Sequence, residues 1–188
     1  MPVFTVIDHQ EFTGATTEWS KTSIPTSYDH LLVKASTRST RSGAEYGAFT
    51  VKLNSSSEAD NYFVVTLDAS TATPISTIEP DSSGASAGYT GEFQGGRQPA
   101  ADAVAWAFST VTMWIPHYAN TTNYKQILLT QMFPNDSTTD DEWQVSTRAC
   151  VFKFSTDDKR AVDAVAMRRN WNDFAEYSTF TLYGITGA

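Results

Sequence analysis

The chain has 188 residues, with 13 Lys and Arg against 21 Asp and Glu, and its formal net charge of −8 excludes a nucleic-acid binder that depends on a clustered basic face. Only 18% of the residues are charged, while Ser and Thr together make up about a quarter of the chain. The hydrophobic fraction of 40% excludes a disordered chain and is enough for one domain with its own core, spanning 1–188.

The first part of the chain alternates apolar and polar residues with a period of two, which is the pattern of strands that bury one face. Runs of this kind lie at 3–12 and 16–21. The clearest run follows at 30–38, where the odd-numbered positions from Leu31 to Thr37 share one face and Lys34 belongs to the other.

Two further strands are predicted before residue 69. In 49–54 the apolar residues at odd positions are expected to face inward, while Thr50, Lys52 and Asn54 face outward. In 61–68 both faces are largely apolar, which favours a strand in the centre of a sheet.

The alternation then ends in a passage rich in Ser, Thr, Gly and Pro over residues 69–99. A structureless insertion of about thirty residues is unusual in a compact domain, so we expect a short strand or turn inside it. The Ala-rich segment 100–106 follows Pro99 and favours one or two helical turns, because proline suits the first position of a helix.

Strand patterns return in the second half of the chain. They lie at 108–115, 124–133, 143–151, 161–169 and 178–185. The run 124–133 is apolar on both sides, and 143–151 has one apolar face and one polar face. About nine strands without a long helix predict an all-β, antiparallel two-sheet sandwich, whose connections the spacing leaves open.

The sequence also disfavours a membrane protein, a secreted protein and a disulfide-bonded protein. No stretch approaches the roughly 18 consecutive apolar residues of a membrane-spanning helix. The first residues, 1–8, lack the basic start and apolar run of a secretory signal, so we expect a protein made and kept in the cytoplasm. The single cysteine, Cys150, excludes an intrachain disulfide and is expected to be a small buried hydrophobe.

No catalytic motif stands out. The chain has no nucleophile elbow, phosphate loop, zinc-protease helix or Cys-x-x-Cys pair. The glycine-rich stretch 91–96 lacks the lysine of a phosphate loop and is interpreted as a turn. We therefore expect no catalytic residue, no cofactor and no enzymatic activity.

Metal sites are also disfavoured. His9 and His117 are far apart in sequence, and His30 beside Asp29 is interpreted as a hydrogen-bonded surface pair. The acidic residues in 136–142 do not match a calcium-binding loop, so a solvated loop is the plainer interpretation. We expect no metal ligand.

Four residues are candidates for a contact between subunits. Arg38 and Arg41 are the densest positive feature, and their guanidinium groups suit carboxylates of a neighbouring subunit, the plainer alternative being an exposed strand end. Trp114 and Tyr118 are added because interfaces favour aromatic anchors, and the five tryptophans exceed what one small core requires.

Three segments, 22–38, 115–125 and 177–185, resemble virion structural proteins of tailed bacteriophages. This resemblance implies a small β-sandwich of jelly-roll type that is built into the virion in many copies, commonly as a trimer. Its partners would be the major capsid protein or the tail proteins, and its location the virion, with no nucleic acid or membrane bound.

Two functions follow from the resemblance. The first is a capsid decoration, or cement, protein that stabilises the shell through contacts between subunits. The alternative is a tail or tail-fibre module that recognises glycans, with Trp114 and Tyr118, or Asp140, Glu142 and Trp143, as its candidate platform. A third alternative is a glycan depolymerase.

Overall fold

The structure is a computed structural model that describes residues 1–54, 62–69, 74–80, 91–134, 144–152, 159–170 and 172–187. Within these ranges the chain forms twelve strands and no helix. The strands are β1 (Val3–Glu11), β2 (Glu18–Lys21), β3 (His30–Thr37), β4 (Tyr46–Leu53), β5 (Tyr62–Ala69), β6 (Pro74–Pro80), β7 (Phe93–Pro99), β8 (Ser109–Pro116), β9 (Lys125–Phe133), β10 (Gln144–Phe152), β11 (Val165–Arg169) and β12 (Thr179–Thr186).

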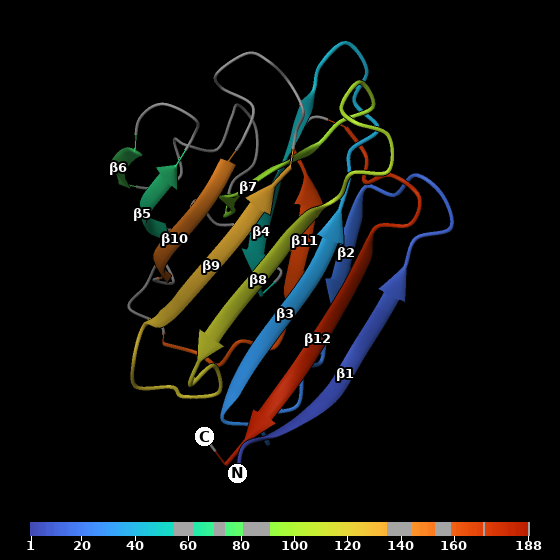
Figure 1. Cartoon of the computed structure of the whole chain (residues 1–188). Helices are drawn as coiled ribbons and strands as arrows, with labels where there is room; N and C mark the ends of the chain where they lie inside the picture. The colour runs from blue at the N-terminus through green and yellow to red at the C-terminus, as the bar shows by residue number, and fades with distance from the viewer. Residues whose placement is uncertain are drawn as a thin grey trace.

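The strands pair antiparallel and form two sheets. The large sheet has eight strands in the order β1-β12-β3-β8-β9-β10-β5-β6, and the small sheet has four in the order β2-β11-β4-β7. Figure 1 shows β2, β11 and β4 lying behind β12, β3 and β8, so that the two sheets face each other. The predicted all-β, antiparallel two-sheet sandwich is confirmed.

The path of the chain through eight of the strands is that of a jelly roll. With β5, β6, β9 and β10 set aside, the chain alternates between the sheets from β1 to β4, returns to the small sheet for β7, and alternates again through β8, β11 and β12. The resulting orders, β1-β12-β3-β8 and β2-β11-β4-β7, bring the first and last strands side by side, as two nested Greek keys do. Strand pairing therefore decides the topology that the spacing leaves open.

Four more strands widen the large sheet beyond β8. The pair β9 and β10 is inserted between β8 and β11, and the pair β5 and β6 between β4 and β7. Both β6 and β7 lie within the passage 69–99, so the strand expected there is confirmed. The run 61–68 becomes β5, which lies one strand from the end of the sheet and not at its centre.

The core fills the space between the two sheets. Val33 of β3, Met113 of β8 and Phe49 of β4 are fully buried in it. Trp19 of β2 stacks on Phe180 of β12, with 5.4 Å between the ring centroids and 7° between the ring planes. Burying side chains of this size stabilises the fold by about 1.5–3 kcal/mol each. The apolar faces predicted for 30–38 and 49–54 supply this core.

Two residues, one in β4 and one directly after it, depart from the prediction. Thr50 and Asn54 were expected to face outward into solvent, and both are buried. Thr50 donates to the Glu92 carboxylate with 2.5 Å between the oxygens. The Asn54 side chain donates to the Ala161 carbonyl and accepts the amide N–H of Asp163. Polar partners from distant segments satisfy both side chains, which is why burial is tolerated.

The helical turns predicted for 100–106 are wrong. The segment forms successive turns, closed by bonds from the Ala103 N–H to the Ala100 carbonyl and from the Ala107 N–H to the Val104 carbonyl. The carbonyls of Ala101, Ala103, Val104 and Ala107 accept hydrogen bonds from one side chain, Arg38. A helix would use such carbonyls internally, so this tertiary contact outweighs the local preference of alanine.

Candidate functional site

The outer face of the large sheet, the face that points away from the small sheet, is apolar over β9 and β10. β9 alternates strictly between buried and exposed side chains, and Leu128 and Met132 are 47% and 52% exposed. On β10 the apolar residues Val145 and Val151 are exposed. The polar side of this strand points inward together with Cys150, which is buried as predicted, and burial raises the pKa of its thiol.

β5 continues the same arrangement. Val65 and Leu67 are exposed, Leu67 at 56%, whereas Val64 and Thr66 are buried. The two apolar faces recognised in the sequence of this strand therefore have different environments. One face packs into the protein and the other lies on its surface.

The strand register joins these side chains into rows that cross several strands. Trp114 of β8 pairs with Leu128, Leu128 with Ala149, and Ala149 with Val65. A neighbouring row pairs Thr112 with Thr130, Thr130 with Thr147, and Thr147 with Leu67. Residues directly opposite each other in a sheet share one face, so the rows form one continuous surface.

We call this surface the outer patch. It consists of Val65, Leu67, Thr110, Thr112, Trp114, Gln126, Leu128, Thr130, Met132, Val145, Thr147, Ala149 and Val151. None of these residues is charged, although the chain carries a net charge of −8. The outer patch can therefore be desolvated at little electrostatic cost.

Trp114, a predicted contact residue, lies in the outer patch and is held there by His30. The two rings are 4.8 Å apart between centroids, and the His117 ring is also 4.8 Å from that of His30. The Nδ1 atom of His30 accepts the backbone N–H of His117 at 3.1 Å. Since His30 is buried, its interpretation as a surface residue is wrong.

This histidine pair has a defined electrostatic setting. Burial lowers the pKa of His30, the charge of His117 lowers it further, and the charge of Asp29 opposes both effects. The sequence did not indicate this pairing, because His30 begins β3 and His117 follows the end of β8, far along the chain. Across the described ranges, no three His, Cys, Asp or Glu side chains come together as a set of metal ligands.

Tyr118, another predicted contact residue, is not on the surface. Its side chain is fully buried and its hydroxyl donates to the Pro25 carbonyl. Burial raises the pKa of this hydroxyl. Trp114 and Tyr118 therefore do not form an exposed platform, because one residue belongs to the outer patch and the other to the core.

Both arginines bind within their own chain. The two terminal nitrogens of Arg38 donate to four backbone carbonyls of the segment 101–107, the shortest contact being 2.7 Å to Val104. Arg41 donates to the Tyr46 carbonyl at 3.1 Å and lies 5.8 Å from the centroid of the Tyr46 ring. Arg38 therefore organises a turn of this chain, and a contact of Arg38 with another subunit stays a prediction.

The small sheet has a different outer surface. Glu18, Lys52 and Arg168 line a cavity of about 240 Å³ on it. Arg168 binds Glu18 at 2.6 Å and also binds the Glu92 carboxylate, which has no exposed side-chain surface. Burial lowers the pKa of Arg168, but the hydrogen bond and charge of Glu92, with those of Glu18, outweigh burial and raise it. Arg168 and the two carboxylates thus bind one another, and this charged face contrasts with the uncharged outer patch.

Several residues singled out in the sequence lie outside the described ranges. They are Asp136, Asp140, Asp141, Glu142 and Trp143. No helix in the part of the chain that the structure describes is long and apolar enough to cross a membrane.

No family model and no curated protein matches the chain. Among solved structures, the chain has a weak similarity to the alginate lyase Aly36B, with 11% sequence identity and a TM-score of 0.21. The match covers 98% of this chain and 73% of the lyase chain. A similarity at this level carries no argument about activity.

Proposed function

We propose that the protein is a non-enzymatic structural component of a tailed bacteriophage virion, specifically a capsid decoration protein that packs its outer patch against neighbouring shell proteins. The observation that carries this proposal is the uncharged, largely apolar outer face that runs from β8 to β5. The resemblance of three segments to virion proteins supplies the identity of the partner.

The size of the outer patch supports a role in association. Strands lie about 4.8 Å apart and residues on one face about 6.8 Å apart, so the patch covers roughly 400 Å² of flat sheet. The largest apolar patch on a typical monomer has a comparable area and is often functional. A stable interface needs about 800 Å² on each partner, so contacts beyond the outer patch must contribute as well.

The chemistry of the patch suits packing against another protein. The threonines and valines of the patch are β-branched and form a flat surface whose side chains lose little freedom on packing. Trp114 and Met132 provide larger groups that fill a partner's grooves. Each copy would add buried area between shell proteins and so resist the separation of neighbouring subunits.

The proposal is tested by adding purified protein to virion shells that lack it and measuring the bound copies by sedimentation and mass spectrometry. Leu128→Glu is expected to reduce binding strongly, because it places a charge in the centre of the patch. Val3→Glu is the matched control, since Val3 is an exposed apolar residue of β1 outside the patch. Absence of the wild-type protein from purified particles, or equal binding by both variants, contradicts the proposal.

A tail or tail-fibre position remains the alternative, because the same face serves any neighbour within a virion. Imaging of labelled particles distinguishes the two positions. Signal over the whole shell supports decoration, and signal at one vertex supports a tail component. A trimer, which the resemblance favours, is tested by light scattering of the isolated protein.

A further inference from the structure

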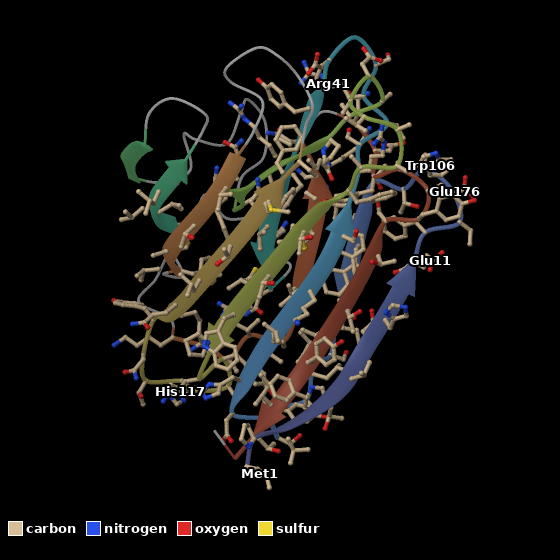
Figure 2. The ribbon with its side chains drawn as sticks, viewed as in Figure 1. Met1, Glu11, Arg41, Trp106, His117 and Glu176 are labelled. Atoms are coloured by element: carbon tan, nitrogen blue, oxygen red, sulfur yellow. The ribbon has the colours of Figure 1, made fainter. Side chains whose placement is uncertain are left out.

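A pocket lies at one end of the sandwich, just before the start of β8, and shares no residue with the outer patch. The turns between β7 and β8 meet the segment that leads into β12, and together they enclose about 350 Å³. Trp106 and Tyr177 line the pocket with Glu176 and Arg38. Figure 2 shows Trp106 and Glu176 close together at this end, far from His117 at the other end.

Two aromatic rings of the pocket are exposed to solvent. Trp106 is 78% exposed and Tyr177 is 50% exposed, whereas Trp19 is fully buried in the core. The ring centroids of Trp106 and Tyr177 are 6.4 Å apart, and their planes meet at 42°. The rings therefore present two adjacent, splayed faces, and a large part of each ring is open to solvent.

The backbone at both aromatic residues adopts a conformation that bulky side chains rarely occupy. The φ angle is 65° at Trp106 and 67° at Tyr177, in the left-handed region. The Tyr177 N–H is bound to the Phe12 carbonyl at 2.8 Å, and Arg38 holds the carbonyls around Trp106. Fixed structure thus maintains an unfavourable conformation that keeps both rings outward, an arrangement typical of binding sites.

The charges around the pocket restrict the ligand. The Arg38 guanidinium is a fixed positive charge in the wall, and it disfavours a cationic ligand. The exposed Glu176 carboxylate disfavours an anionic ligand. A neutral ligand that has both an apolar face and hydroxyl groups suits the two rings and the Glu176 carboxylate, and neither charge of the wall repels it.

We propose that the Trp106–Tyr177 pocket binds a neutral sugar ring of a glycan. The C–H face of the ring packs on the aromatic side chains, and sugar hydroxyls donate to the Glu176 carboxylate. These residues differ from the glycan platforms suggested by the sequence. None of the pocket residues belongs to the outer patch, so the proposal does not depend on the proposed role in the virion.

The isolated protein is screened on an array of neutral, acidic and amino glycans, and the best neutral glycan is then titrated by calorimetry. Trp106→Ala is expected to weaken binding at least about tenfold, while Trp106→Phe retains most of it. Glu176→Gln is expected to cause a smaller loss, since the amide still accepts a hydrogen bond.

Phe4→Ala is the matched control, because Phe4 is an exposed aromatic residue of β1 outside the pocket. Leu128→Glu is expected to leave glycan binding unchanged, which separates this site from the outer patch. The proposal is overturned if no neutral glycan binds, if charged glycans bind better than neutral ones, or if Trp106→Ala binds as tightly as the wild type. A circular dichroism spectrum of each variant verifies that the variant is folded.

Discussion

Leu128 and Leu129 are neighbours on β9 whose side chains lie on opposite faces of the large sheet. Leu128 is exposed in the outer patch, and Leu129 is fully buried in the core. Two leucines one residue apart therefore have opposite environments, because successive residues of a strand point to opposite faces of the sheet.

This pair makes a direct test of the outer patch. Leu128→Glu is expected to change the free energy of unfolding by no more than about 1 kcal/mol, because the new carboxylate remains in water. Leu129→Glu is expected to prevent folding, because it buries an unpaired charge at a cost of at least about 4 kcal/mol. Urea denaturation followed by circular dichroism measures both variants, and equal effects would contradict the assignment of the two faces.

Arg38 is expected to stabilise the turns between β7 and β8. Arg38→Ala removes the donors for four carbonyls and is expected to lower the free energy of unfolding by about 2 kcal/mol. Arg38→Lys is expected to recover only a small part of this loss, because one ammonium group cannot reach all four carbonyls. Hydrogen exchange over 101–107 is expected to accelerate in both variants. Wild-type exchange in Arg38→Ala would argue against this role.

Gly95 is expected to be intolerant of a side chain. A Cβ atom there would lie 2.1 Å from the Cε2 atom of the buried Phe49 ring, so Gly95→Ala forces the core apart. The expected loss is about 1–3 kcal/mol in the free energy of unfolding. Gly14→Ala is the control, since no atom lies within 4 Å of its added Cβ. Thermal denaturation should separate the two variants, and equal melting temperatures would refute the close contact.

His30 is expected to make the fold sensitive to acid. Its folded-state pKa is lowered by burial and by the charge of His117, so below about pH 6.5 the unfolded chain binds a proton more readily than the folded chain. The stability is therefore fully present above the unfolded-state pKa and is lost as the pH falls through the folded-state value. Denaturation at a series of pH values from 7.5 to about 5 measures this slope.

His30→Gln is expected to flatten the pH dependence even if it also lowers the overall stability. His9→Gln is the control, because His9 is exposed on β1, where its Nδ1 atom lies 2.8 Å from the Thr181 hydroxyl. An unchanged slope in His30→Gln would assign the acid sensitivity to another group.

The positions of most strands follow from the sequence because alternation is a local property of an extended chain. The runs at 30–38, 49–54 and 108–115 needed no knowledge of their neighbours, since each has one clearly apolar face. Within 69–99 the alternation is weak, so the sequence predicted a strand or turn there without locating β6 or β7.

Local patterns were less informative where both faces of a strand are apolar. Val65 and Leu67 look like core residues in the sequence, yet they are exposed because β5 lies in the part of the large sheet that extends past β8. Thr50 looks like a surface residue, yet it is buried because Glu92 supplies a partner from another segment. The environment of a side chain depends on what packs against it.

The sequence by itself determined an all-β chain with an ordinary core, low charge and no recognisable catalytic motif. Only the tertiary structure decided the jelly-roll connectivity, the outer patch, the burial of Tyr118 and the internal use of Arg38. It also brought Trp106 and Tyr177 together, although they are far apart in sequence. The reason is physical: alternation is set by neighbouring residues along the strand, whereas burial and shared sites are set by pairing between distant segments.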